Sequence, residues 1–157
     1  MTTNTSLNRI KSMPLWQGEI SAVPLDGGIT NVNYVVTDGD KKYVVRLGED
    51  IPKHHVMRFN ELSASRAAHL AGLSPAVIYT EPGITVLQFI ECATYSPEDV
   101  RKLENLKRIL LLIQKCHVEV PRHLRGPALI SWVFHVIWDY AASLQDAGNS
   151  NTRLYGS

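Results

Sequence analysis

Alternating apolar and polar residues in the first third of the chain predict β-strands. Three segments are rich in β-branched and aromatic residues and are separated by turn signals: 19–25, 33–37 and 41–47. Asp38-Gly39 marks a tight turn between the second and third segments. The two-residue period of a strand puts Val44 and Arg46 on one face and Val45 on the other. We therefore expect Arg46 to point in the same direction as Val44.

The pattern changes to a helical one after Pro52. From about Lys53 to Ala71, leucine and alanine recur at helical spacing, and Gly72 follows as a stop signal. Glu61 falls in the middle of this helix. Two further strands, 76–79 and 85–90, are expected around the turn Glu81-Pro82-Gly83. The predicted order is thus three strands, one helix and two strands.

Helices are expected in the last third of the chain. Ser96 is a good capping residue, and Pro97 suits the first helical position. An apolar stripe then continues along the helix: Val100, Leu103, Leu106, Leu110 and Ile113. So wide an apolar arc is typical of a helix buried inside a lobe. We expect a loop over 121–127, a second helix over 130–144, and a short helix or irregular arm over 6–18.

Composition narrows the class of protein. A chain of 157 residues with 45% hydrophobic content suits one globular domain. Its 16 Lys and Arg balance 15 Asp and Glu, so no basic field favours nucleic acid or an anionic membrane. Cys92 and Cys116 are too few for a disulfide scaffold. Two cysteines fit a reducing cytosol, and no signal peptide or bilayer-length apolar run is present, so we expect a cytoplasmic protein. The histidines show no metal-ligand spacing.

The turn between the first two predicted strands carries the most distinctive chemistry. Gly27 and Gly28 allow positive φ and close approach of a ligand, and the side chains of Thr30, Asn31 and Asn33 can donate to phosphate oxygens. The spacing fits neither the Walker pattern nor the dinucleotide-binding pattern. A glycine turn that leads into a hairpin is instead the arrangement of a kinase-type glycine loop. The alternative is an ordinary hairpin turn.

The order of these features resembles a known family. Residues 27–34, the strand that carries Arg46, Glu61 in the following helix and residues 87–91 look like the amino-terminal half of choline/ethanolamine kinase-like proteins. These proteins belong to the wider group of aminoglycoside phosphotransferase-like and protein-kinase-like folds. A looser similarity continues through 111–117 and 134–140, so the resemblance covers nearly the whole chain.

The resemblance implies an α+β fold. Residues 1–91 would form a nucleotide-binding amino-terminal lobe, with a five-stranded antiparallel sheet and one helix. Residues 92–157 would form the first helices of an incomplete carboxy-terminal lobe.

The resemblance also implies roles for individual residues. The loop over the phosphates of ATP would comprise Gly27, Gly28, Ile29, Thr30, Asn31 and Asn33. Arg46 would replace the phosphate-binding lysine of kinases, and Glu61 would be the helix carboxylate that holds it. Gln88, Phe89 and Ile90 would form the hinge beside the adenine. The alternatives are that Arg46 is an edge-strand charge, that Glu61 is a solvated helix residue beside Arg58, and that the fifth strand has no hinge role.

The sequence departs from this family at the catalytic loop. Kinases of this type use an aspartate at the acceptor hydroxyl, an asparagine four residues later, and a further aspartate that holds Mg²⁺. No His-x-Asp opening occurs in the chain, and neither His135 with Asp139 nor Asp146 with Asn149 or Asn151 has the required spacing. We expect ATP as ligand, no catalytic residue or Mg²⁺ ligand in this chain, and no kinase activity from it alone.

Three functions remain open at this point. The first is that the chain is a truncated piece of a kinase that phosphorylates an amino-alcohol hydroxyl such as that of choline or ethanolamine. The second is a non-catalytic nucleotide-binding or protein-interaction module. The third is a structural partner that completes another chain. Trp132, Phe134 and Trp138 on the last predicted helix would leave an apolar patch. That patch implies a homodimer or a missing carboxy-terminal partner, and it favours the truncated kinase.

Overall fold

The computed structural model describes residues 3–26 and 30–148. Its elements, in chain order, are α1 (Thr3–Lys11), β1 (Ile20–Leu25), β2 (Val32–Asp38), β3 (Lys41–Leu47), the 3₁₀ turn η1 (Pro52–His54), α2 (Arg58–Leu70), β4 (Val77–Glu81), β5 (Ile84–Gln88), α3 (Pro97–Arg101), α4 (Leu103–His123) and α5 (Val133–Asp146). Contacts group the chain into two units, Met1–Pro127 and Ala128–Ser157. The lobe boundary between residues 91 and 92 stays a prediction.

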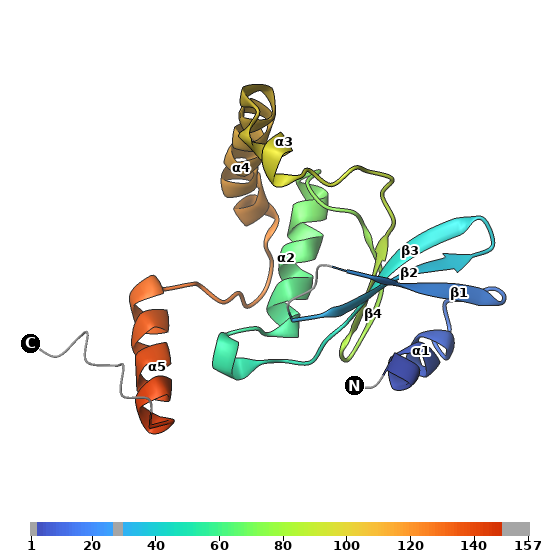
Figure 1. The fold of residues 1–157 in the computed structure, drawn as a ribbon, viewed down its shortest axis with the longest axis horizontal. Coiled ribbons are helices and arrows are strands. Elements are labelled where there is room, and N and C mark those ends of the chain that lie inside the picture. Colours follow the sequence, from blue (N-terminus) through green and yellow to red (C-terminus); the bar gives the residue numbers. More distant parts are fainter. Residues whose placement is uncertain (1–2, 27–29, 149–157) are drawn as a thin grey trace, which may run out of the picture. The chain divides into compact units, whose positions relative to one another are not determined.

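The centre of the first unit is a five-stranded sheet with the order β1-β2-β3-β5-β4 (Figure 1). Every neighbouring pair of strands is antiparallel. The turn between β2 and β3 is made by Gly39, whose φ is +57°, in agreement with the tight turn expected there. The structure confirms the predicted α+β fold and the order of three strands, one helix and two strands.

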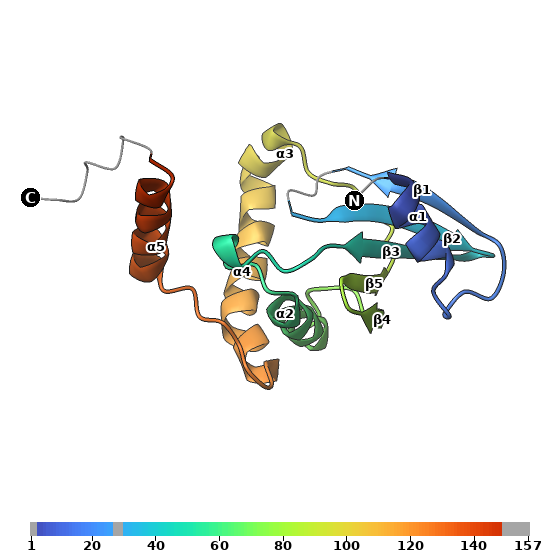
Figure 2. The same ribbon diagram turned by 90° about the horizontal axis from the view of Figure 1, so that it is seen from below.

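The hydrophobic core lies on the face of the sheet that α1 covers (Figure 2). Six strand residues contribute to it: Tyr34, Val36, Val45, Leu47, Ile84 and Val86. Ile10 of α1 and Met13 just after it complete the cluster. Trp16 packs beside them and donates from Nε1 to the carbonyl of Ile10 at 2.6 Å. The predicted arm is therefore a helix followed by a packed segment, and it forms one wall of the core.

The opposite face of the sheet carries Val44 and Arg46, as strand alternation predicted. Both are half-buried, whereas Val45 and Leu47 between and after them are buried. Glu61 of α2 lies within salt-bridge distance of Arg46, so the first turn of α2 lies on this side. The face with Arg46 is the one available for a site.

Helix α2 begins five residues later than expected. The expected start at Lys53 is instead the 3₁₀ turn η1, which ends at His55 with a left-handed φ of 54°. Backbone hydrogen bonds then join Ile51 and Val56 in an isolated bridge. Left-handed geometry at a residue with a side chain interrupts a helix, so the regular turn begins only at Arg58. The predicted stop at Gly72 is confirmed by its positive φ of +69°.

The helices that follow are also divided differently from the prediction. Ser96 forms the expected capping box with Asp99, but α3 ends after one turn because Lys102 takes an extended conformation with ψ 130°. α4 then runs to His123 and contains Pro121, so the first part of the predicted loop is helical. Pro121 lacks the N–H that would donate to the carbonyl four residues earlier, but α4 ends at His123, so little of the helix lies beyond this interruption.

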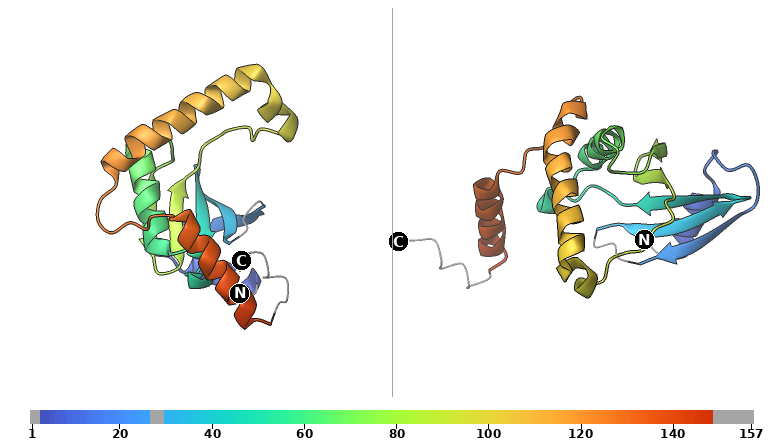
Figure 3. Two further views of the ribbon diagram at one scale, coloured as in Figure 1. Left: turned by 90° about the vertical axis from the view of Figure 1, so that its left-hand side faces the viewer. Right: turned by 90° about the horizontal axis from the view of Figure 1, so that it is seen from above.

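Helix α4 packs against α2 (Figure 3). The apolar stripe that was expected to be buried is exposed, with Val100, Leu103, Leu106, Leu110 and Ile113 all open to solvent. In the second unit, α5 begins at Val133 rather than near residue 130. Trp132 and Phe134 meet edge to face there, with ring centroids 5.4 Å apart. Among the described residues, no helix is long and apolar enough to cross a membrane.

Candidate functional site

The site is built around the carboxylate of Glu61, on the first turn of α2. Arg46 reaches it from β3, with Nη1 3.0 Å from Oε1. The Arg46 side chain is 36% exposed and the Glu61 side chain 26% exposed. The predicted pair therefore exists, although it is half-buried rather than enclosed between strand and helix. Because water still reaches it, Arg46 can exchange part of its interaction with Glu61 for a ligand.

A second arginine shares the same carboxylate. From the sequence, Arg58 was expected only as a neighbour of Glu61 on a solvated helix face. Arg58 Nη1 lies 2.5 Å from the other oxygen of Glu61, Oε2. The alternative pairing with Arg58 and the predicted pairing with Arg46 thus occur together. Two guanidinium groups against one carboxylate leave one positive charge uncompensated within the group. Such a group favours an anion.

Two asparagines add polar groups: Asn31, just before β2, and Asn33 within it. Asn31 donates from Nδ2 to Glu61 Oε1 at 3.5 Å. Asn33 lies directly opposite Arg46 in the β2–β3 register. The Oδ1 atoms of both asparagines are buried and have no hydrogen-bond partner within the part of the chain that the structure describes. A buried acceptor without a partner costs about 1–3 kcal/mol, so both atoms favour a donor from water or a ligand.

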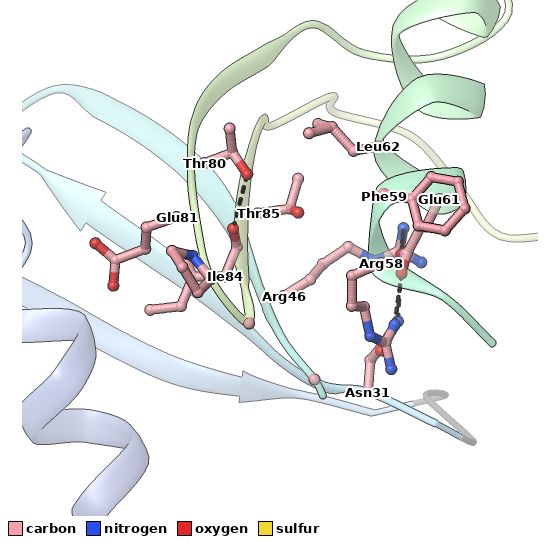
Figure 4. A pocket seen from close by; sticks show the side chains of 13 residues that line it. Asn31, Arg46, Arg58, Phe59, Glu61, Leu62, Thr80, Glu81, Ile84 and Thr85 are labelled. Carbon is pink, nitrogen blue, oxygen red and sulfur yellow. Dashed lines mark hydrogen bonds and ion pairs between the residues drawn. The ribbon is translucent and has the colours of Figure 1, made fainter. Parts of the chain in front are cut away.

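Cavities lie on both sides of this charged group. One, of about 230 Å³, lies between β3, the β4–β5 turn and α2. Figure 4 shows Arg46, Arg58 and Asn31 converging on Glu61 at the edge of this cavity. Another, of about 290 Å³, adjoins residues 55–57. The same four side chains line both cavities, so the charged group is accessible from two directions.

An apolar row lies beside the charged row on the same face of the sheet. The register pairs Val23 with Val35, Val35 with Val44, and Val44 with Leu87. Directly opposite residues of antiparallel strands share a face, and Val44 is two residues from Arg46, so the row continues the face that carries Arg46. Val23 is 61% exposed. This row was not predicted from the sequence, because alternation identifies a face only within one strand. The register between strands is needed to align the valines.

The predicted hinge follows β5 at the other end of β3. The backbone N–H of Phe89 donates to the carbonyl of Lys42 at 3.4 Å. The ammonium of Lys42 lies 5.3 Å from the centroid of the Phe89 ring and pairs with Glu91 at 2.8 Å. Gln88 and Ile90 are exposed. The structure places this segment directly after Leu87, at one end of the apolar row, and its role stays a prediction.

The predicted glycine loop is described only in part. Gly27, Gly28 and Ile29 lie outside the described residues. Thr30 follows them, and its carbonyl accepts a hydrogen bond from Arg58 Nη2 at 3.2 Å. The described part of the loop is therefore connected to the charged group through its backbone.

The fold of this chain, rather than its sequence, has counterparts among known proteins. No protein-family model matches the chain, and no curated protein matches it in sequence. An ethanolamine kinase from Plasmodium vivax aligns with 82% of the chain, at 19% identity and a TM-score of 0.64. A choline kinase from Cryptosporidium parvum aligns with 95% of it, at 15% identity and a TM-score of 0.67.

The aligned region is a limited part of each kinase. The chain spans 37% of the ethanolamine kinase and 45% of the choline kinase, less than half of either. At such low identity the likeness concerns the fold alone. The chain has a kinase-like α+β fold, with the sheet and α2 of an amino-terminal lobe followed by helices of a partial carboxy-terminal lobe.

Proposed function

We propose that the sheet and α2 form a nucleotide-binding lobe in which Arg46 holds the phosphates of ATP. The observation that carries this proposal is the contact of 3.0 Å between Arg46 and Glu61 on the sheet face that also presents the apolar row. A guanidinium fork binds phosphate oxygens in a bidentate manner. The apolar row beside it, which is exposed at Val23 and half-buried at Val35 and Val44, suits one face of a purine ring.

The remaining contacts to the nucleotide are assigned as in the sequence-based hypothesis. The loop residues Gly27, Gly28, Ile29, Thr30, Asn31 and Asn33 cover the phosphates. Gln88, Phe89 and Ile90 present their backbone to the adenine edge. The pairing of Phe89 with Lys42 supports this assignment, since it fixes the start of that segment beside β3.

Magnesium does not fit the described residues of this site. The two carboxylates that line the cavity of about 230 Å³ are Glu61 and Glu81. Glu61 is shared by two arginines, and Glu81 accepts from the Tyr79 hydroxyl at 2.8 Å and lies 3.8 Å from Arg9. Mg²⁺ requires oxygen ligands in near-octahedral geometry, with carboxylates available to it. We therefore propose that ATP binding by this chain alone does not depend on Mg²⁺.

The likeness to an ethanolamine kinase and a choline kinase supports an amino-alcohol hydroxyl as the acceptor of a full-length form. The sequence of this chain contains no catalytic loop of the kinase type. We propose that the chain belongs to the nucleotide-binding half of such a kinase and that it transfers no phosphoryl group alone. We also propose that it acts in the cytoplasm, because its free cysteines suit a reducing environment.

A second candidate function is that of a non-catalytic interaction module. The observation that favours it is the exposure of the aromatic side chains on the second unit, where Trp132 is 61% and Trp138 67% exposed. Exposed aromatic side chains at such density are enriched at protein interfaces. This candidate predicts a protein partner and leaves nucleotide binding without a role.

Calorimetry with ATP, with and without Mg²⁺, tests the first proposal. We expect binding by the chain and a loss of about tenfold or more in affinity in Arg46→Ala, because a charge-assisted hydrogen bond contributes about 1.5–3 kcal/mol. The variant keeps its fold, since Glu61 retains Arg58 as a partner.

Arg66→Ala is the matched control for charge. It removes an exposed arginine from α2 at a position that lines neither cavity. Equal affinity in wild type and both variants would contradict the role of Arg46. No binding by a folded wild-type chain would contradict the proposed function and leave the interaction module.

A further inference from the structure

Arg58 connects its own helix with two earlier segments of the chain, around Glu49 and Thr30. Its Nη1 pairs with Glu61 at 2.5 Å, its Nη2 donates to the carbonyl of Thr30 at 3.2 Å, and its Nε donates to the carbonyl of Glu49 at 2.8 Å. Each of the three nitrogens of the guanidinium thus has an acceptor in a different segment. The side chain is only 19% exposed.

The backbone of Arg58 is held as well. Its N–H donates to Asp50 Oδ1 at 2.6 Å, which supplies the helix end with an acceptor that Met57, at the N-cap position, does not provide. The first residue of α2 is therefore fixed through both its main chain and its side chain. Its guanidinium has little freedom to move toward a ligand.

Gly48 leaves the space through which this side chain passes. A Cβ atom at Gly48 would lie 2.6 Å from Arg58 Nη2 and 2.5 Å from Asn31 Oδ1. Both distances are well below van der Waals contact. The end of β3 therefore accommodates Arg58 and Asn31 only because residue 48 has no side chain.

Arg58 determines which carboxylate oxygen of Glu61 is available to Arg46. Oε2 is taken by Arg58, so Oε1 is left to face Arg46 and Asn31. Without Arg58, both oxygens of Glu61 would be available to the Arg46 fork in a bidentate pair. Such a pair would withdraw donors of Arg46 from a ligand.

We propose that Arg58 is a positioning residue for the nucleotide site. It holds the described part of the glycine loop, at the carbonyl of Thr30, to α2, and it orients Glu61 so that Arg46 keeps donors for a phosphate. The expected effect of Arg58 on ATP binding rests on the proposed function. The expected effect of Arg58 on the ligand-free protein does not. Arg58 acts through Thr30, Glu49 and Glu61 and makes no contact with the nucleotide itself.

The first arm of the test measures ATP affinity by calorimetry in Arg58→Gln, Arg58→Lys and the control Arg66→Gln. We expect both Arg58 variants to bind about tenfold more weakly, because one ammonium cannot serve three acceptors in separate segments. The control should bind as wild type does. Restoration of affinity by lysine would overturn the proposal, since it would show that Arg58 supplies only charge.

The second arm measures amide hydrogen exchange without nucleotide. In Arg58→Gln we expect faster exchange at Val32 and Asn33, the first residues of β2, while the core amides of Val45 and Val86 exchange as in wild type. Unchanged exchange at Val32 and Asn33 would overturn the positioning role even if ATP binding were weaker. A wild-type chain that binds no ATP would contradict the proposed function, and the exchange data would still decide the role of Arg58.

Discussion

At the scale of single residues, Glu61 contributes orientation more than stability. Its side chain and that of Arg46 both remain in contact with water. Ion pairs at such positions contribute about 0–1 kcal/mol, because solvent screens the charges and ordering long side chains costs entropy. The main effect of Glu61 is therefore on the orientation of the Arg46 side chain.

Glu61→Gln separates these two effects. We expect the free energy of unfolding, measured with urea, to fall by about 1 kcal/mol or less. ATP affinity should fall by more, because the neutral amide no longer holds either guanidinium in place. A loss of about 3–5 kcal/mol of stability would instead be the behaviour of a buried ion pair. That outcome would contradict a half-buried site.

Sequence reasoning reaches part of this residue cluster. The family resemblance implied the pairing of Arg46 with Glu61, and strand alternation placed Arg46 on the same face as Val44. The spacing of Arg58 and Glu61, three residues apart on a helix, is a signal for a pair, but such pairs are common on solvated faces. The contact of Arg58 with Thr30 spans 28 residues and depends on tertiary structure. No local pattern in the chain encodes it.

At the scale of elements, α1 is an integral part of the sheet domain. Ser6 and Ile10 are buried at a spacing of one helical turn, and Met13 extends the same contact. A pattern this short is weak evidence for a helix in isolation, since helices of fewer than about 12 residues are marginal without tertiary packing. The sheet, rather than helix propensity, therefore stabilises α1.

Ile10→Ala tests the contribution of this helix. Ile10 is 0% exposed, and removing such a side chain from a packed core costs about 2–5 kcal/mol. Leu70→Ala, at a residue of α2 that is 65% exposed, should cost about 0.5 kcal/mol or less. Chemical denaturation of the two variants measures both. Equal small effects would show that α1 does not pack on the sheet.

The cap of α3 gives a prediction for pH. A hydrogen bond from the Lys102 ammonium, with further hydrogen bonding to Ser96, lowers the pKa of Asp99 below its ordinary value of 3.8. A carboxylate with a lowered pKa in the folded state stabilises that state above its ordinary pKa. The contribution is lost as the pH falls through the lowered value. The cap should therefore persist at neutral pH and weaken only below about pH 3.8.

Carbon-13 NMR titration of the Asp99 carboxyl measures this directly. We expect Lys102→Ala to raise the pKa of Asp99 toward 3.8. Lys107→Ala, which removes an exposed lysine of α4 instead, should leave it unchanged. A titration curve for Asp99 that is identical in all three proteins would show that Lys102 does not hold the cap.

At the scale of the whole molecule, the two halves of the chain differ in how well the sequence predicts burial. The order of strands and α2 is set by turn signals and alternation, which act locally, so this order was predictable. The kinase-like character of the fold was implied by the family resemblance. The apolar stripe of α4 was expected to be buried, yet Leu103 is exposed. Periodicity identifies an apolar face, but it does not specify the surface that covers the face.

We propose that the aromatic side chains of α5 mediate association, either with a second copy of the chain or with a carboxy-terminal partner. Sedimentation velocity should show an average mass that rises with protein concentration. The double variant Trp132→Gln with Trp138→Gln should reduce this rise, because it removes two exposed apolar surfaces. Leu70→Gln, at an isolated exposed leucine of the first unit, serves as the control. A monomer at every concentration would contradict self-association.

The central claim is that the sheet face with Arg46 binds a nucleotide, and mapping of ATP binding by amide chemical shifts tests it most directly. We expect the largest shifts at Asn33, Arg46 and Val44 during a titration with ATP. The amides of α5 should change little. Shifts confined to α4 or α5, or no shifts in a folded sample, would contradict the claim that this face is the binding site.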